Sequence, residues 1–396
     1  MLSGGRLEAP NNTPMRVAII HYWLVSMRGG ERVIEALCEL YPEADIYTHV
    51  VDPKRISDTI RRHTIRTTFV SKLPWARQRY KAYLPFMPLA LEQLDLRQYD
   101  LVISSESGPA KGVLTRPDAL HVCYCHTPMR YVWNMHHEYG RGVTRPLRWL
   151  TAGLLHRIRQ WDIATSLRVD YFIANSHNVA GRIRKYYRRN AFVIPPPVDL
   201  ARFESNAPPS AQDGGYYLCV GQLVAYKQVG LAVAAFTAMR KRLIVVGEGQ
   251  QRSELEGIAG PDVRFVDRVD DATLRDYYAG CRALVFTAEE DFGIVPLEAM
   301  AAGRPVIAFG RGGALETVVP GRTGLFFAEQ TVESLTEAVH RFEGIEDTFD
   351  PAAIRAHART FSKHRFQTAF LDYVRQVMAE HEHRSEMTLQ PSVALS

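Results

Sequence analysis

Short apolar runs recur along the chain, and most are followed by a stretch with the apolar spacing of a helix. The first, Arg16–His21 with the sequence RVAIIH, is apolar on both faces, which is typical of a buried parallel strand. The other runs of this kind are Asp45–Val51, Leu101–Ser104, 120–126, 171–175, Tyr216–Val220, Leu243–Val246, Val263–Val266, Ala283–Phe286 and Val306–Phe309. Strands that alternate with helices in this way predict an α/β fold built on parallel sheets.

The segment 289–309, EEDFGIVPLEAMAAGRPVIAF, links two of these strands through a short predicted helix. Pro296 falls in the first turn, where a missing N–H costs nothing. Gly303 suits the position just after the helix, and Pro305 prevents the helix from continuing. The segment is therefore predicted to run strand, acidic loop, helix, strand.

Two carboxylates lie near the start of this predicted helix. Glu290 is in the loop and Glu298 is about one turn into the helix. The free N–H groups and partial positive charge of a helix N-terminus suit a phosphate, and a carboxylate beside it suits sugar hydroxyls. That combination outlines a nucleotide-sugar site. The alternative is a solvated acidic loop before an ordinary helix, since acidic residues are common in a first turn.

The pattern E-D-F-G-I-x-P-x-E-A-x-A-x-G-x-P-V-I-A, with Glu290 and Glu298 as its E-x7-E pair, resembles the retaining family 4 glycosyltransferases. The likeness extends from about Arg16 to Met378. It implies the GT-B architecture, an α/β fold with two facing Rossmann-like domains and a cleft between them. It also implies a set of donor-binding residues: Gly29, Gly30, Gln222, Lys227, Val266, Glu290, Phe292, Gly293, Ile294, Val295 and Glu298.

A chain of 396 residues fits two domains of this size. The triple proline at 195–197 is a stiff connector, so we place an N-terminal, acceptor-binding domain at 15–198 and a C-terminal, nucleotide-sugar-binding domain at 199–365. The resemblance implies that the last helix, about 366–381, returns to the first domain. We expect residues 1–14 and 387–396 to be disordered.

His126 is the last residue of the predicted strand at 120–126, at the end where open α/β sheets bind ligands. A lone histidine is more often structural, but the resemblance gives this one a place close to the donor sugar. The family carries Arg and Lys in the pattern G-R-L-x-x-x-K; Lys227 is present, but Gln222 replaces the Arg. Asp267 replaces a family glycine beside the nucleotide base. The resemblance thus nominates His126, Glu290 and Lys227 as catalytic residues.

Charge is distributed unevenly along the chain. The first 200 residues carry 28 Lys and Arg against 17 Asp and Glu, whereas the remainder carries 20 against 26. Residues 69–94 interleave basic and aromatic side chains, and a second such stretch spans Arg145–Leu167. This pattern suits an anionic membrane surface. We assign to a membrane or acceptor face Lys72, Trp75, Arg77, Arg79, Lys81 and Arg130.

Two alternatives compete with the membrane interpretation of these stretches. Their apolar side chains could belong to the core, and their basic ones could contact nucleic acid. No recognised nucleic-acid-binding motif supports the latter, so we expect no nucleic-acid partner. The five cysteines are odd in number and scattered, which favours reduced thiols in the cytosol. We therefore expect a cytoplasmic protein that is peripheral on the inner face of the plasma membrane.

The resemblance also suggests the reaction. It favours transfer of a hexose, α-mannosyl from GDP-mannose first, to a polyprenyl-diphosphate-linked oligosaccharide in exopolysaccharide or surface-polysaccharide synthesis. The alternatives are another nucleotide sugar such as UDP-glucose or UDP-GlcNAc, an epimerase of nucleotide sugars, and a non-catalytic membrane scaffold. The chain has no Asp-x-Asp pattern, so we expect neither a metal ion nor any other cofactor.

Overall fold

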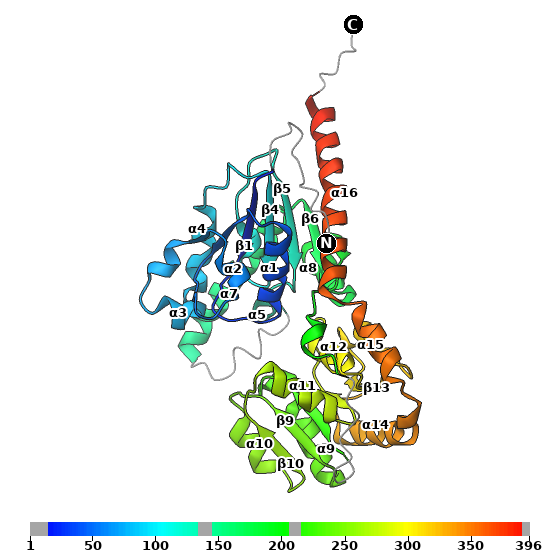
Figure 1. Cartoon of the computed structure of the whole chain (residues 1–396). Coiled ribbons are helices and arrows are strands. Elements are labelled where there is room, and N and C mark those ends of the chain that lie inside the picture. Colours follow the sequence, from blue (N-terminus) through cyan, green and yellow to red (C-terminus); the bar gives the residue numbers. More distant parts are fainter. Residues whose placement is uncertain (1–14, 134–144, 206–214, 390–396) are drawn as a thin grey trace. The chain divides into compact units, whose positions relative to one another are not determined.

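The computed structural model describes residues 15–133, 145–205 and 215–389. The chain divides into two compact units, the first containing residues up to Pro196 together with those from Phe366 onward, and the second Pro197–Arg365. The expectation of disorder at 1–14 and 390–396 concerns residues outside the described ranges. Each unit is an α/β structure with its own parallel sheet (Figure 1).

The first unit contains a seven-stranded sheet in the order β3-β2-β1-β4-β5-β6-β7. Every neighbouring pair of strands is parallel. The strands are β1 (Val17–His21), β2 (Asp45–Thr48), β3 (Ile65–Thr67), β4 (Leu101–Glu106), β5 (Leu120–Cys125), β6 (Tyr171–Ala174) and β7 (Ala191–Val193). Strand order reverses between β1 and β4, so the topological switch point of this sheet lies there.

Helices cover this sheet and connect its strands. They are α1 (Gly29–Leu40), α2 (Asp58–Arg61), α3 (Ala76–Arg79), α4 (Met87–Glu92), α5 (Arg130–Trp133), α7 (Arg145–Ser166), α8 (His177–Tyr187) and α16 (Lys363–Leu389), with 3-10 turns η1 (Phe69–Lys72), η2 (Tyr80–Phe86) and η3 (Ala110–Gly112). Residues 69–94 form four short pieces, as prolines in that stretch require.

Helix α16 contributes to the core of the first unit. Its buried residues Phe366, Phe370, Val374 and Val377 share one face at helical spacing and pack with the apolar residues of β1, β4 and β5. The helix continues to Leu389, so the expectation of disorder from residue 387 is wrong for residues 387–389. The sequence there contains no proline or glycine that would end a helix.

The second unit contains a six-stranded parallel sheet in the order β10-β9-β8-β11-β12-β13, with its switch point between β8 and β11. The strands are β8 (Tyr217–Val220), β9 (Leu243–Val246), β10 (Val263–Val266), β11 (Leu284–Phe286), β12 (Val306–Phe309) and β13 (Gly324–Phe327). The helices are α9 (Val229–Met239), α10 (Arg252–Ile258), α11 (Asp271–Gly280), α12 (Ile294–Ala301), α13 (Ala314–Thr317), α14 (Val332–Ile345) and α15 (Pro351–Arg359), with turns η4 (Leu200–Arg202), η6 (Ala225–Lys227) and η7 (Glu346–Thr348).

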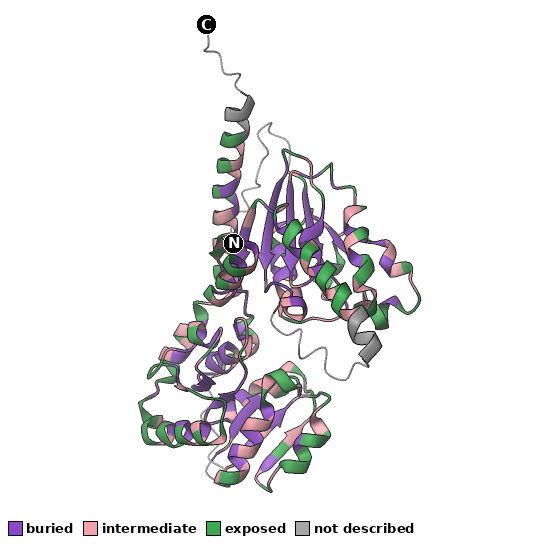
Figure 2. Ribbon diagram, turned by 180° about the vertical axis from the view of Figure 1, so that it is seen from behind, coloured by how far each residue is buried: buried purple, intermediate pink, exposed green. Residues whose placement is uncertain are grey.

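Both sheets are largely buried, while the helices expose one side (Figure 2). All five residues of β1 are buried, as its two-sided apolar sequence predicts. The five cysteines are buried and unpaired in disulfides. No helix in the described part of the chain is long and apolar enough to cross a membrane. The fold thus places two switch points, each at the carboxyl ends of a parallel sheet, where open α/β folds bind ligands.

Candidate functional site

The segment 289–309 adopts the predicted order of elements. Helix α12 follows the acidic loop, with Pro296 in its first turn and Gly293, in a left-handed conformation at φ 88°, as its N-cap residue. Gly303 adopts φ 76°, and the amides of Gly303 and Arg304 donate to the carbonyls of Met300 and Ala299 at 2.9 and 3.0 Å. These two bonds form a Schellman motif, which is why glycine ends the helix here.

A cation and a carboxylate meet at the switch point of the second unit. Lys227 follows β8, Glu290 follows β11, and their side chains form an ion pair in which each is 17% exposed. The backbone carbonyl of Lys227 accepts a hydrogen bond from Thr287 Oγ1 at 2.9 Å, and Gln330 Nε2 donates to the Thr287 carbonyl at 2.8 Å. The loops after β8 and β11 are therefore tied together, and the pair is held in place from both sides.

The glycine pair 312–313 fixes the acidic loop. The Gly313 amide donates to the Glu290 carbonyl at 2.8 Å, and Gly312 has φ 62°. A Cβ on Gly312 would lie 2.4 Å from the Glu290 carbonyl oxygen, and one on Gly313 would lie 2.2 Å from Phe292 Cα. Only glycine allows this close approach. The backbone turn at Gly312 and Gly313 therefore holds the loop that carries Glu290. Helix α13 follows this turn and has Glu316 in its first turn.

The remaining predicted donor residues of this unit divide into accessible and buried ones. Glu298, in the second turn of α12, accepts a hydrogen bond from the buried Tyr278 hydroxyl at 2.7 Å. Burial, followed by the proximity of Glu298, raises the pKa of Tyr278 well above its usual value, so this tyrosine stays a neutral donor. Gln222 is exposed after β8, and Val266 ends β10. The Phe292 side chain packs in the core at 4% exposed, so only its backbone is left to face a donor.

Asp267, the residue that departs from the family pattern, follows β10 at the same edge of this sheet. Its carboxylate pairs with Arg252 at 3.0 Å, and the Arg252 guanidinium lies 5.1 Å from the centre of the Phe265 ring. Arg252 also donates to the Gly247 carbonyl at 3.2 Å, at the end of β9. Gly247 is required as glycine because a Cβ there would lie 1.9 Å from the Gly221 carbonyl oxygen.

In the first unit, His126 directly follows β5, as predicted, and neighbours two polar side chains that sequence reasoning missed. Ser105 Oγ lies 2.8 Å from His126 Nε2 and 3.1 Å from His21 Nδ1. His21 ends β1 and Ser105 lies in β4, directly paired with it in the parallel register. The three residues therefore gather at the switch point of this sheet. Burial lowers the pKa of His126 to about 4 and that of His21 well below its usual value, in the latter case with further lowering by His126.

Gly29 and Gly30 are the first two residues of α1. A Cβ on Gly30 would lie 2.9 Å from the Tyr22 hydroxyl oxygen and 3.7 Å from His126 Nε2. Glycine at position 30 therefore lets the first turn of α1 pack directly against the histidine cluster. The Arg28 amide donates to Glu31 Oε2 at 3.0 Å, so the Glu31 side chain satisfies one free amide at the start of this helix.

Five of the six predicted membrane-facing residues lie within residues 72–81, and the sixth, Arg130, lies on α5. Trp75 is 68% exposed, and the Arg79 guanidinium lies 5.3 Å from the centre of its ring. Lys72, Arg77 and Lys81 are also exposed. Arg130, in contrast, is half-buried on α5, and its assignment to a membrane or acceptor face stays a prediction. It directly follows Met129, whose side chain is buried in a small apolar cluster, and this holds Arg130 close to the protein interior.

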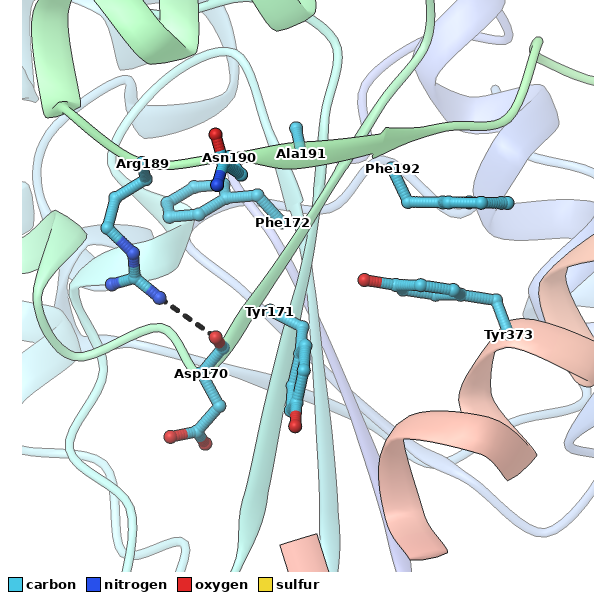
Figure 3. A pocket seen from close by; sticks show the side chains of 8 residues that line it. All are labelled: Asp170, Tyr171, Phe172, Arg189, Asn190, Ala191, Phe192 and Tyr373. Carbon is cyan, nitrogen blue, oxygen red and sulfur yellow. Dashed lines mark hydrogen bonds between the residues drawn. The ribbon is translucent and has the colours of Figure 1, made fainter. Parts of the chain in front are cut away.

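A separate hollow of about 380 Å³ opens at the other end of the first sheet (Figure 3). Its walls come from the start of β6, the start of β7 and α16: Asp170, Tyr171, Phe172, Arg189, Asn190, Ala191, Phe192 and Tyr373. Phe192 and Tyr373 stack with ring centres 4.5 Å apart. Because this hollow adjoins the amino ends of the strands, it is distinct from the switch point that gathers His21, Ser105 and His126.

The comparisons with known proteins agree on one family. Residues 27–202 match the family model described as Glycosyltransferase Family 4, and residues 214–343 match one described as Glycosyl transferases group 1. The chain belongs to the family 4 glycosyltransferases. The resemblance inferred from the sequence is thus confirmed at the level of the family.

The relatives of this family 4 chain are named for different activities. It is 30% identical over 228 residues to a glycogen synthase of Mycobacterium tuberculosis, and the alignment covers 53% of each protein. It is 25% identical over 378 residues to the alpha-1,3/1,6-mannosyltransferase alg2 of Schizosaccharomyces pombe, covering 80% of this chain and 71% of that protein. The chain thus spans about half the length of some relatives and most of others.

Solved structures share the fold. The crystal structure of Anabaena Alr3699/HepE in complex with UDP matches with a TM-score of 0.66 at 15% identity, covering 91% of this chain and all of that one. The GT-B fold class predicted from the sequence is therefore confirmed, with a parallel Rossmann-like sheet in each unit.

Proposed function

We propose that the chain is a retaining hexosyltransferase whose donor is a nucleotide sugar, with α-mannosyl transfer from GDP-mannose as the first choice. The proposed acceptor is a polyprenyl-diphosphate-linked oligosaccharide of exopolysaccharide or surface-polysaccharide synthesis. The observation that carries the proposal is the Lys227–Glu290 pair beside the start of α12, at the switch point of the second sheet.

The chemistry of glycosyl transfer matches these groups. Breaking the sugar–phosphate bond builds negative charge on the leaving diphosphate, and positive groups aimed at that charge lower the barrier. Lys227 supplies a full charge, and the unpaired amides in the first turn of α12 supply oriented dipoles. These groups serve without a metal ion, so we expect transfer to proceed in the presence of a chelator.

The carboxylates have separate proposed roles. Glu298 would accept hydrogen bonds from ribose hydroxyls, while its own position is held by Tyr278. Glu290 and His126 would contact the donor sugar. Retention would follow from attack on the same face of the sugar, with a diphosphate oxygen taking the proton of the acceptor. A covalent intermediate on Glu290 is the second route, and it would require the carboxylate to leave Lys227 first.

Support for mannose and for a nucleotide donor comes from the relatives. The alg2 protein is named as a mannosyltransferase and aligns over most of the chain. The HepE structure contains UDP, which keeps UDP-sugars as alternative donors. An epimerase would act without an acceptor, and a scaffold would not consume the donor. Release of GDP or UDP that depends on added acceptor separates the transferase from both.

We further propose that the basic and aromatic residues of η1–η2 bring the enzyme to the cytoplasmic face of an anionic membrane. An exposed Trp75 beside Lys72, Arg77, Arg79 and Lys81 suits the interface between lipid headgroups and acyl chains. Sedimentation with anionic vesicles at low salt, and release at high salt, would support this face. Equal binding to neutral vesicles at any salt concentration would contradict an electrostatic attachment.

The test of the function is a donor screen with the purified full-length protein. GDP-mannose, UDP-glucose and UDP-GlcNAc would each be incubated with a lipid-diphosphate-linked disaccharide acceptor in the presence of EDTA. We expect sugar to move to the acceptor from GDP-mannose. Transfer from a UDP-sugar instead would correct the donor, whereas hydrolysis without transfer from every donor would reject the transferase.

A further inference from the structure

The strongest feature that the proposed function leaves unexplained is the chain of polar side chains His21, Ser105 and His126. The Ser105 hydroxyl bridges the two imidazoles, with Oγ 3.1 Å from His21 Nδ1 and 2.8 Å from His126 Nε2. His21 is 1% exposed, and its Nε2 is buried without a hydrogen-bond partner among the described residues. A buried polar atom without a hydrogen bond lowers the stability of the fold, so the unpartnered Nε2 of His21 needs a physical explanation.

Both imidazoles are neutral at pH 7. Burial lowers the pKa of His126 to about 4 and that of His21 well below its usual value. A neutral imidazole carries one proton, on either nitrogen, and a serine hydroxyl donates one hydrogen bond and accepts others. The protons on His21, Ser105 and His126 can therefore be counted, and three arrangements of them account for both hydrogen bonds.

In the first arrangement, His21 donates from Nδ1 to Ser105, and Ser105 donates to His126 Nε2. Both hydrogen bonds then have a donor and an acceptor, His21 keeps a bare Nε2, and the Nδ1–H of the partly buried His126 is left for a ligand. In the second arrangement, His126 Nε2 donates to Ser105 and Ser105 donates to His21 Nδ1. His21 then carries its proton on Nε2, where it has no acceptor. In the third, both histidines donate to Ser105, and the serine hydroxyl has no acceptor of its own among the described residues. Buried donors without acceptors are rarer than under-used acceptors, which favours the first arrangement.

We propose that Ser105 and His21 are positioning residues that hold His126 in the tautomer with its proton on Nδ1, so that His126 offers an N–H donor to its ligand. Nδ1 makes no hydrogen bond to any described residue, so it is the ring nitrogen left for a ligand. With the donor assigned above, and resting on that proposed function, the ligand atom is an oxygen of the donor sugar. His126 then acts as a hydrogen-bond donor and not as a general base.

Helix α1 protects this arrangement. A Cβ on Gly30 would lie 3.5 Å from His21 Cε1 and 3.7 Å from His126 Nε2, so the backbone of the first turn covers the Ser105 side of both rings. Ser105 is fully buried as well. Water is thereby kept from competing for the bond between Ser105 and His126, and a dry hydrogen bond fixes a tautomer more firmly than one exposed to solvent.

The direct test is a long-range ¹H–¹⁵N correlation spectrum of the full-length protein with ¹⁵N-labelled histidine. The protein contains 14 histidines. The signals of His126 are assigned as those that disappear from the spectrum of His126→Asn. We expect His126 to show a protonated, pyrrole-type Nδ1 and a bare, pyridine-type Nε2. The opposite pattern, with the proton on Nε2, would overturn the proposal whatever the activity of the enzyme.

Matched variants separate positioning from structural support. His21→Asn keeps a donor where Nδ1 stands, and His21→Leu removes it. We expect His21→Leu and Ser105→Ala to mix the tautomers of His126 and to lower kcat roughly tenfold, the rate equivalent of about 1.4 kcal/mol. His21→Asn should keep both the tautomer and most of kcat. Equal losses in His21→Asn and His21→Leu, with the His126 spectrum unchanged, would show a structural role only.

This design keeps the inference separate from the assignment of function. If no donor is transferred but His126 shows a protonated Nδ1, the proposed function fails and the positioning by Ser105 and His21 stands. If transfer occurs with the proton on Nε2, the function stands and the positioning fails. Should a variant not fold, the spectrum of the unmodified protein decides alone.

Discussion

Replacement of Lys227 by methionine is the most informative single change in the second unit. It removes the positive charge while keeping most of the aliphatic stem, so packing is disturbed little. At an effective dielectric constant of about 20, a unit charge about 4 Å from a leaving phosphate oxygen contributes about 4 kcal/mol. Loss of one such group from a preorganised site typically costs about 2.7–4 kcal/mol, or a factor of ~10²–10³ in kcat.

The effect on folding should be much smaller. The ion pair with Glu290 is partly exposed at both ends, at 17% for each side chain, so breaking it costs about 1 kcal/mol. For a unit of this size, 1 kcal/mol corresponds to a shift of about 2–4 °C in Tm. Lys227→Met should therefore lose most of its activity and keep nearly all of its stability.

A matched control lies in the same unit. Lys241 pairs with Glu343 at 2.7 Å with side chains 28% and 23% exposed, but it precedes β9 and so stands at the opposite end of the sheet. Steady-state transfer kinetics and calorimetric Tm would be measured for Lys227→Met and Lys241→Met. An unchanged kcat in Lys227→Met, or equal losses in the two variants, would refute the reasoning.

Two further predictions concern the first unit. Gly30→Ala should lower kcat/KM and Tm because the added Cβ would lie 2.9 Å from the Tyr22 hydroxyl oxygen. The control Gly181→Ala on α8, where the added Cβ would meet nothing within 4 Å, should raise the free energy of unfolding by about 0.5–1 kcal/mol. Equal Tm changes of the two variants in thermal melts would contradict this. Burial raises the pKa of Glu106 to about 7 from an ordinary 4.5, although Lys111 opposes the shift, so the folded state binds this proton more tightly. The contribution of Glu106 to the free energy of unfolding should fall as the pH rises from about 4.5 to about 7, and Glu106→Gln should remove that fall. The free energy of unfolding would be measured at each pH by denaturant titration followed by tryptophan fluorescence. This signal reports on the first unit, which contains all five tryptophans.

The sequence could predict features that depend on local backbone chemistry. The helix in 289–309 carries its own start and stop signals, and the structure contains the Schellman motif that Gly303 predicts. The position of His126 after β5 was also predictable, since a polar residue ended an apolar run. Strands β3 and β13 were missed; the sequence of β3, IRT, contains a single apolar residue and so no apolar run.

Features that depend on contacts between strands could not be predicted. His21 and Ser105 are 84 positions apart, and only the parallel register of β1 and β4 brings them together. A polar residue at the end of each apolar run was the available signal, but it does not say which runs are neighbours. The burial of the Phe292 side chain likewise follows from packing against Phe361, which no local pattern reveals.

The central claim is that this chain moves a sugar from a nucleotide to an acceptor with the anomeric configuration preserved. The most direct measurement is the configuration of the new glycosidic bond, read by NMR from product made with α-linked GDP-mannose and the lipid-diphosphate-linked acceptor. An α linkage, formed by the unmodified protein and lost in Lys227→Met, is the predicted result. A β linkage, or GDP released with no sugar on the acceptor, would contradict the account.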